Sequence, residues 1–516
     1  MISVYFENRD FTPYIPQHWE SLETKKYTKN AVWGCDRAYI TAYGTETQLF
    51  EFVEMLRCPV YLSDTDRAER VWWGYVHAVD VHTEGGLVYG VSLNTMSNSV
   101  SVAHTYDHKR YTVDFATDSD SIDEYGQKDI QLQASDKSTL EATQLRDTKL
   151  QELKYPISVL TMGSPGNSFA VIECRGWHHT LDERYYSNDT GLEEYWDLND
   201  YHGREIGEDN RPIAAQSFQL SSATGWTPTH IYLRVSKIGA PVDNLLVDLY
   251  DDDDSDTSPE DSLTGGATAL DCATVNTYYE DTKFTIDTPP ALSTETLYWI
   301  YITRSGAVDG DNHAMIGANK AKGYDNGQLK LKKGSSWITW TSRDSDLNFR
   351  VVREAATTTQ ISECITAVGG FYLGTTVVDA SGINSLVYRD GDATAMYEIK
   401  KMMEAGTTND RRLLSRTTDL RIFEVYEEPA KDSGDYFIDS WGNITDENDV
   451  PVPKSECTVA KWVRLKDVVP GSANVSKLAK PSPAFIESAE YSPIHDTYKF
   501  KTRSGKALLS LTGETG

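Results

Sequence analysis

Clustered carboxylates are the first feature of this sequence that could do chemistry. The densest charge lies in a run of aspartates, residues 251–254 and 256. Ca²⁺ needs clustered oxygen ligands, but this run lacks the alternating ligands, the sixth-position glycine and the twelfth-position glutamate of an EF-hand loop. We therefore interpret the run as a solvated acidic loop between two strands, with a Ca²⁺ site near Asp251 as the alternative.

A pair of histidines is the second candidate. His178 and His179 precede Asp182 and Glu183, and imidazole and carboxylate groups together can bind a metal ion or transfer protons. Adjacent residues of a strand point to opposite faces of the sheet, so a strand would not direct both histidines at one ion. The sequence therefore predicts no metal site here. His77 and His82 flank a predicted hairpin and are expected to be half-exposed strand positions.

A third candidate is a pair of aspartates before a helical pattern. Asp390 and Asp392 flank Gly391, and Asp392 fits the N-cap of that helix. The alternative is the carboxylate pair of a glycoside hydrolase, which needs two carboxyl groups at a defined separation. The sequence contains no G-x-S-x-G, H-E-x-x-H or Walker motif. We therefore predict no catalytic residue and a protein that is not an enzyme.

Aromatic side chains are candidates for sugar binding, because their flat faces can stack on the apolar faces of sugar rings. Trp337 and Trp340 lie in one predicted strand and point to opposite faces, so one of them should be exposed. Together with Tyr324 they are the predicted ligand-binding residues. Trp299 lies in a continuous apolar strand and is predicted to belong to the core.

The composition indicates that strands position these residues. There are 30 Tyr and 12 Trp but only 8 Met among 516 residues, and Tyr and Trp favour strands. A chain of this length should form about three or four domains. The net charge of −29 repels phosphates, which excludes sequence-specific nucleic-acid binding. A channel through which DNA slides is the exception.

Cysteines and apolar runs set further limits. None of the six cysteines lies in a C-x-x-C pair, so we expect buried free thiols and no zinc ribbon. The first residues lack a basic segment followed by an apolar one, and there is no apolar run near 18 residues. We expect a soluble chain without a Sec-type signal or membrane insertion.

The mixture of predicted helices and strands changes along the chain. A hairpin over 71–93 and helices over 47–56 and from Ser138 make the first part mixed, and helices over 359–368 and 392–403 make the last part mixed.

The middle of the chain differs from both flanks. An acidic, polar stretch over 186–211 indicates a linker, and seven or eight short strands without helices follow from residue 214, as in a β-sandwich. We therefore predict a mainly β fold with minor α content and four segments: 1–115, a β-barrel-type domain; 116–204, an α/β segment; 205–357, an inserted jelly-roll sandwich; and 358–516, helices and a second barrel-type domain with an extended C-terminal tail.

A series of different short motifs runs through both flanks of the chain. They include WWGYV at 72–76, GVSLNTMSNSV at 90–100 and YRDGDATA at 388–395, with others at 125–126, 145–148, 155–156, 175–177, 185–186, 406–407, 412–414, 425–429 and 462–467. In these motifs the chain resembles bacteriophage tail hub proteins of the baseplate-hub type. The resemblance implies a homotrimer in which two barrel-type domains per chain form a pseudo-six-fold ring that closes the tail tube. It implies no catalytic residues.

The middle part carries a separate resemblance. In residues 215–218, 232–241 and 297–300 it is similar to jelly-roll modules related to carbohydrate-binding domains. We therefore expect a structural protein of the virion tail tip, assembled in the host cytoplasm, whose inserted module contacts a glycan or a protein of the host surface. Its expected partners are tail tube, distal tail and tail fibre or spike proteins, a host-surface glycan, and DNA as passing cargo. The alternatives are a secreted or surface glycan-binding adhesin and, with less support, a glycan-degrading enzyme.

Overall fold

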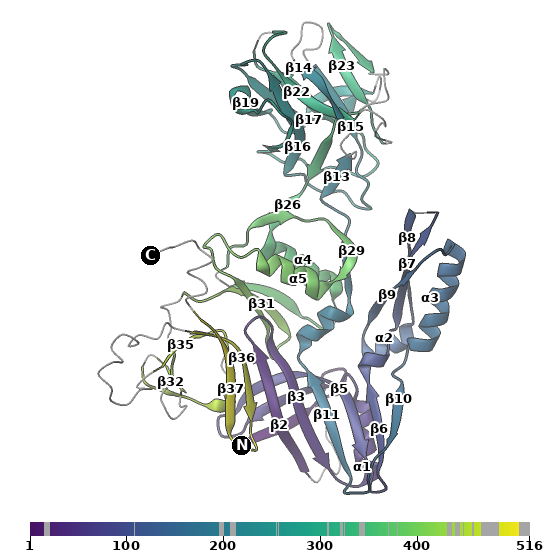
Figure 1. Ribbon diagram of the computed structural model, residues 1–516, viewed down its shortest axis with the longest axis vertical. Helices are drawn as coiled ribbons and strands as arrows, with labels where there is room; N and C mark the ends of the chain where they lie inside the picture. The colour runs from purple at the N-terminus through teal and green to yellow at the C-terminus, as the bar shows by residue number, and fades with distance from the viewer. Residues whose placement is uncertain are drawn as a thin grey trace. The chain divides into compact units, whose positions relative to one another are not determined.

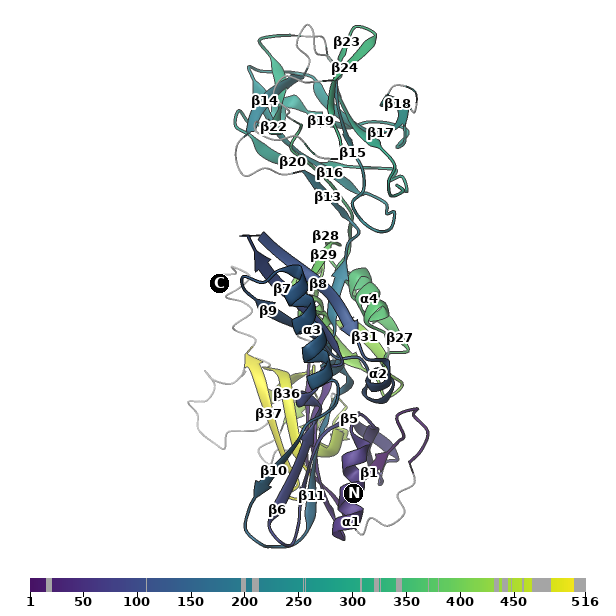
Figure 2. The same cartoon turned by 90° about the vertical axis from the view of Figure 1, so that its right-hand side faces the viewer.

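In the computed structural model the chain is mainly β, as the sequence predicts. Its described residues form two units, each treated below by itself (Figures 1 and 2). Unit 1 consists of Met1–Tyr186, Thr357–Ile383 and Asp392–Gly516, and unit 2 of Ser187–Ala356 and Asn384–Gly391. The structure describes residues 1–14, 21–107, 109–195, 201–206, 213–253, 255, 257–306, 309–319, 324, 326–339, 346–369, 371–378, 380–430, 436–438, 444–446, 448–456, 459–465 and 484–504.

Unit 1 is built on a sheet of 14 strands, which curls in Figure 1. The strand order is β1-β4-β5-β11-β3-β2-β36-β35-β32-β33-β34, with β6 beside β5, β10 beside β6 and β37 beside β36. The bounds are β1 Ile2–Phe6, β2 Ser21–Asn30, β3 Gly34–Tyr43, β4 Pro59–Asp64, β5 Glu69–His82, β6 Leu87–Ser92, β10 Ser158–Met162, β11 Phe169–Arg175, β32 Tyr436–Ile438, β33 Ile444–Thr445, β34 Pro451–Val452, β35 Trp462–Leu465, β36 Ala484–Ser492 and β37 Thr497–Ser504.

The core of this sheet forms around β5. Trp72 and Tyr75 are wholly buried, and the helical segments α1 (Glu46–Phe50) and η1 (Glu51–Met55) add Leu49 and Phe52 to the same core. The predicted hairpin is present as β5 and β6. His77, which was expected to be half-exposed, is only 1% exposed because β5 contributes buried residues to both of its faces.

The two ends of unit 1 share this sheet. Strand β36 pairs antiparallel with β2, with Tyr27 opposite Tyr491 and Asn30 opposite Ser488. The expectation of an extended C-terminal tail was therefore wrong for residues 484–504, which form the hairpin β36–β37. A strand signal was present, because lysines alternate with aromatic residues in β37, as suits a partly exposed strand.

Two smaller sheets complete unit 1. Each has three strands and combines one parallel with one antiparallel pair, in the orders β8-β7-β9 and β27-β31-β30. Helix α3 packs on β7 and β8, and α4 packs on β27 and α5. The bounds are β7 Ser99–Tyr106, β8 Lys109–Thr117, β9 Asp129–Ala134, β27 Gly374–Val378, β30 Leu413–Thr417, β31 Ile422–Glu427, α2 Ser119–Tyr125, α3 Thr139–Leu153, α4 Thr357–Val368 and α5 Ala395–Glu404.

The predicted helix starts are right in one case and wrong in the other. Ser138 and Glu141 form the capping box that begins α3. Helix α5 is capped by Thr394, whose hydroxyl accepts from the Tyr397 N–H, and not by Asp392. Asp392 instead pairs with Arg110 at 2.9 Å, because β29 (Arg389–Thr394) keeps it extended.

Unit 2 is a β-sandwich of two sheets, as the sequence predicts for this region. One sheet has the order β13-β25-β16-β22-β14 with β20 beside β16, and the other β18-β17-β21-β15-β23-β24 with β19 beside β17. Alternate residues of both sheets, such as Leu233 and Ile300, form one core. The bounds are β13 Leu192–Tyr195, β14 Tyr201–Ile206, β16 His230–Ile238, β20 Glu280–Thr285, β22 His313–Asn319, β25 Phe349–Val352, β15 Ile213–Phe218, β17 Asn244–Asp253, β18 Ser258–Ser262, β19 Thr268–Asp271, β21 Tyr298–Arg304, β23 Leu329–Lys333 and β24 Ser336–Thr339.

The stretch predicted to be a linker is part of this sandwich. Strands β13 and β14 lie at the two ends of the first sheet, so the linker prediction for 186–211 was wrong there. Edge strands commonly carry charge, which protects their free side from other chains. Because β13 and β14 carry charged residues, they lack the alternation of apolar and polar residues by which a strand is recognised in a sequence. Unit 2 accordingly begins at Ser187, whereas the predicted insert begins at residue 205.

The remaining elements are short. They are β12 Tyr185–Asn188, β26 Glu354–Ala356, β28 Asn384–Leu386, η2 Leu93–Thr95, η3 Trp177–Glu183, η4 Cys272–Thr274 and η5 Lys454–Glu456. The five cysteines that the structure describes are buried. Within the described chain, no helix has the length and apolar character needed to cross a bilayer.

Candidate functional site

The outer face of the seven-stranded sheet carries a row of aromatic side chains. In β21, Ile300 and Ile302 point into the sandwich core, so Tyr301 between them points outward. Tyr250 of β17 stacks on Tyr301, with ring centroids 4.4 Å apart and planes 16° apart. Trp337 of β24 meets Tyr301 edge-on at 6.1 Å. We call Tyr250, Tyr301 and Trp337 the aromatic row.

Strand pairing explains why these rings meet. Ala215 of β15 lies opposite both Tyr301 and Lys330, and its small side chain leaves room for the rings of Tyr301 and Trp337 to meet over β15 and β23, the two strands between them. Lys332 is the cross-strand partner of Trp337, and its Nζ lies 5.4 Å from the centre of the indole. All three rings of the aromatic row are half-buried, so part of each surface faces solvent.

The predicted ligand-binding residues have three different placements. Trp337 belongs to the aromatic row. Tyr324 lies in the sandwich core, 8% exposed and edge-on to Phe349, and its hydroxyl hydrogen-bonds the Glu193 carboxylate. Because the ring is buried in the core, neither of its faces is open to a sugar. Trp340 lies outside the described residues.

Burial also affects the ionisation of that core pair. Desolvation, together with the hydrogen bond to Glu193, raises the pKa of Tyr324, and desolvation raises the pKa of Glu193. This is the behaviour of a polar contact that fixes the sandwich core, and not of a solvent-facing binding residue.

Sequence reasoning missed Tyr250 and Tyr301, although a signal was present. Each alternates with aliphatic residues that face the core, so the period-2 pattern places both on the outer face. Trp299 was predicted to be in the core. It is fully buried, but on the outer face, where its indole donates to Asp252 at 2.7 Å and lies 5.5 Å from the Lys330 ammonium.

The acidic run is not a loop over its first three residues. Asp251, Asp252 and Asp253 end strand β17, where Asp252 and Asp253 pair with β18. Their carboxylates accept hydrogen bonds from the Asp261 N–H, the Trp299 indole and the Ser255 N–H. These contacts use carboxylate oxygens for folding, and Ca²⁺ binding near Asp251 stays a prediction. Residues 254 and 256 lie outside the described chain.

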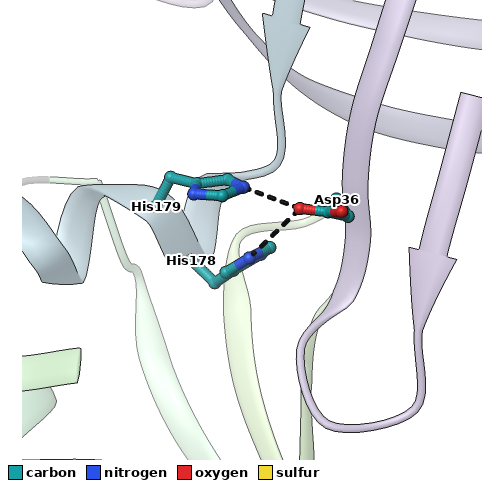
Figure 3. A group of neighbouring side chains, drawn as sticks. All are labelled: Asp36, His178 and His179. Carbon is teal, nitrogen blue, oxygen red and sulfur yellow. Dashed lines mark hydrogen bonds and ion pairs between the residues drawn. The ribbon is translucent and has the colours of Figure 1, made fainter. Parts of the chain in front are cut away.

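The histidine pair lies in unit 1, beside a carboxylate that sequence reasoning did not connect with it. Figure 3 shows His178 and His179 of η3 directed at Asp36 of β3. His179 Nε2 lies 2.8 Å from Asp36 Oδ1, and His178 Nε2 lies 3.9 Å from the same oxygen. The premise of a strand was wrong: in a 3₁₀-helix successive side chains are about 120° apart, so neighbouring rings can converge.

Burial sets the protonation of this cluster. Desolvation lowers the pKa of His178 to about 3, and its neighbour His179 adds to the effect while Asp36 opposes it. Desolvation alone would raise the pKa of Asp36, but the hydrogen bond from His179 and the charges of both histidines bring it below its ordinary value. At neutral pH, His178 is neutral and Asp36 is ionised.

The acidic residues that follow the histidines point elsewhere. Asp182 accepts a hydrogen bond from the Thr394 hydroxyl at 3.0 Å, and Glu183 forms a buried ion pair with Arg57. Among the residues that the structure describes, Asp36, which is 143 positions from His179 in sequence, completes the cluster. Nothing in the local sequence could have identified it.

No family model matches the chain, and no curated protein matches it either. Similar solved structures include a glycoside hydrolase family 43 arabinoxylan arabinofuranohydrolase from Bacillus subtilis, at 10% identity and a TM-score of 0.14, covering 58% of this chain and 64% of that one. They also include the Cry4Aa toxin of Bacillus thuringiensis (5%, 0.16, 62% and 53%) and infectious bursal disease virus VP2 (11%, 0.12, 66% and 78%). TM-scores this low carry no argument about this chain.

Proposed function

We propose that the protein is a structural component of a bacteriophage tail tip, a trimeric hub that closes the tail tube, with an inserted sandwich that binds a host-surface glycan. The observation that carries the proposal is the pairing of β2 with β36. The two flanks that resemble tail hub proteins are separated by the sandwich in sequence, yet they contribute strands to one sheet. A hub body with an insertion requires this arrangement.

The sheet of unit 1 also has an edge suited to another copy of the chain. Strand β10 pairs only with β6 among the described residues, and all five of its residues are exposed. Val159, Leu160 and Met162 are 56%, 63% and 77% exposed. An exposed apolar edge strand favours association with another strand. We propose that β10 lies in the contact between copies of the trimer.

The aromatic row supports glycan binding by the sandwich. Tyr250, Tyr301 and Trp337 form a continuous half-exposed aromatic surface, and such rings are suited to the apolar faces of sugars. The proposed non-enzymatic role fits a surface of this kind, which holds a ligand without catalytic groups. Other tail proteins would attach to unit 1, and the net charge of −29 would let DNA pass without being retained.

Two measurements on the full-length chain test the proposal. Sedimentation or native mass measurement should give three copies, and antibodies against the chain should label tail tips of phage particles. A stable monomer that is absent from particles would contradict the hub function. Incubation with host envelope polysaccharide should release no oligosaccharide, whereas steady release would contradict the non-enzymatic role.

A second candidate function is a secreted or surface adhesin in which the sandwich is the working part. The aromatic row favours it as much as it favours a glycan-binding hub insert. The two are separated by location: an adhesin would be found on or outside cells and not in purified particles.

A further inference from the structure

We propose that Asp36, His178 and His179 bind one divalent transition-metal ion of the zinc class. The site lies wholly in unit 1 and is independent of the proposed hub function. Its two histidines come from η3 and its carboxylate from β3, so the ion would fasten two segments that are distant in sequence (Figure 3).

The distances between the ligand atoms suit such an ion. In a tetrahedral zinc site with bonds of about 2.0–2.1 Å, ligand atoms lie roughly 3.3 Å apart. Asp36 Oδ1 is 2.8 Å from His179 Nε2 and 3.9 Å from His178 Nε2, on either side of that value. The three ligand atoms lie within 4.8 Å of one another. The separations from Asp36 Oδ1 would change by roughly 0.6 Å or less.

The ligands are in the protonation states that a metal needs. Metal binding requires neutral imidazole and ionised carboxylate, which are the ordinary forms of histidine and aspartate side chains above about pH 6.5. His178 Nε2 lies 3.9 Å from Asp36 Oδ1, beyond hydrogen-bond distance, so it is not engaged with that carboxylate.

The surroundings hold the ligands in place. Trp33 stacks on the His178 ring with centroids 5.6 Å apart and planes 9° apart. The Gly176 N–H donates to the Asp36 carbonyl at 2.6 Å, which fixes the start of η3 against β3. Outer contacts of this kind orient metal ligands.

The donor set selects the class of ion. Two imidazoles and one carboxylate suit Zn²⁺ and its neighbours, whereas Ca²⁺ and Mg²⁺ prefer oxygen ligands throughout. The side chains of His179 and Asp36 are 19% and 22% exposed, which gives an entry path and room for a water as the fourth ligand.

Binding should stabilise unit 1, because β3 belongs to its large sheet and η3 contacts α5 and β30 from the last part of the chain. A ligand that binds only the folded state raises the midpoint of thermal unfolding. The stabilisation gives a readout that requires no knowledge of the protein's activity.

The test uses full-length protein treated with a chelator, then titrated with Zn²⁺ by calorimetry and with Co²⁺ by visible absorption. We compare the unchanged chain with Asp36→Asn, His179→Ala and, as the matched control, His495→Ala, which removes an exposed histidine elsewhere. Asp36→Asn keeps the side-chain shape, and His179 is partly exposed, so both variants should fold, as circular dichroism will check.

We expect one ion per chain for the unchanged protein and the control, a higher unfolding midpoint with Zn²⁺, and tetrahedral Co²⁺ bands. In the two site variants the affinity should fall by about tenfold or more. Absence of binding to the unchanged chain would overturn the proposal. So would equal affinity in the site variants, because the ion would then be bound elsewhere.

Discussion

Arg57 and Glu183 form an ion pair that is almost completely removed from solvent, with 2.6 Å between Arg57 Nη2 and Glu183 Oε2 and side chains 2% and 9% exposed. The guanidinium also lies 4.5 Å from the centre of the Tyr75 ring and donates through Nε to the Tyr125 carbonyl. The pair joins the turn before β4 to the end of η3, in the same 3₁₀-helix that carries the histidine cluster.

Breaking this pair should destabilise unit 1. Arg57→Ala leaves the Glu183 carboxylate buried without its counter-charge, which typically costs about 3–5 kcal/mol. The free energy of unfolding, measured with urea, should fall by that amount. The matched control is Arg110→Ala, because Arg110 and Asp392 pair with 54% and 40% of their side chains exposed, and such surface pairs contribute about 0–1 kcal/mol. Equal effects of the two substitutions would contradict the argument.

The fold could be predicted where the local sequence pattern alone determines the secondary structure of a segment. The β5–β6 hairpin and the Ser138 capping box follow from local alternation and capping chemistry. Strands β13 and β14 were missed because their pairing partners, β25 and β22, lie far away in the sequence, and β36 joins the large sheet through β2, which is more distant still. Such partners cannot be read from a short segment.

Stability should fall with acidity because two buried histidines are neutral in the folded state. Desolvation lowers the pKa of His77 to about 2 and that of His178 to about 3, below the ordinary 6.5. Below pH 6.5 the unfolded chain takes up these protons and the folded chain does not, so stability is lost as pH falls. Each histidine contributes a slope of up to about 1.4 kcal/mol per pH unit.

Urea unfolding between pH 6.5 and 5 measures this slope in a window above the ordinary carboxylate range. Replacing His77 by Gln should reduce the slope by one histidine's share, while His495→Gln, at an exposed site, should leave it unchanged. A slope that is the same in all three proteins would contradict the assignment of His77.

Removing the indole of the aromatic row should abolish glycan binding without unfolding the sandwich. Trp337 is half-buried at the end strand β24, so Trp337→Ala should leave the unfolding midpoint nearly unchanged while glycan-array binding by the full-length chain falls to background. Tyr278→Ala is the control, because Tyr278 is 64% exposed and lies outside the row. Equal loss in both variants, or loss in neither, would contradict binding through the aromatic row.

The sequence indicates that one tryptophan of residues 335–340 is exposed. It does not indicate which residues come together with it in the aromatic row, or which carboxylate joins the histidine pair. Tyr250 and Trp337 meet only through Tyr301, on a third strand, and Asp36 meets His179 across 143 positions. Tyr324 was misjudged because it stands alone in a polar stretch, where no alternation indicates which side of it is buried.

The edge strand β10 gives the sharpest test of the trimer. Leu160 is 63% exposed, so Leu160→Lys should leave the fold of a single chain intact. It should still disrupt the association of copies, because a lysine placed on an exposed edge opposes strand-to-strand contact. Sedimentation should show monomers in place of trimers. Val242→Lys, at a 93% exposed position of unit 2, adds the same charge away from this edge and should remain trimeric. A Leu160→Lys protein that is still fully trimeric would place the contact between copies on another surface.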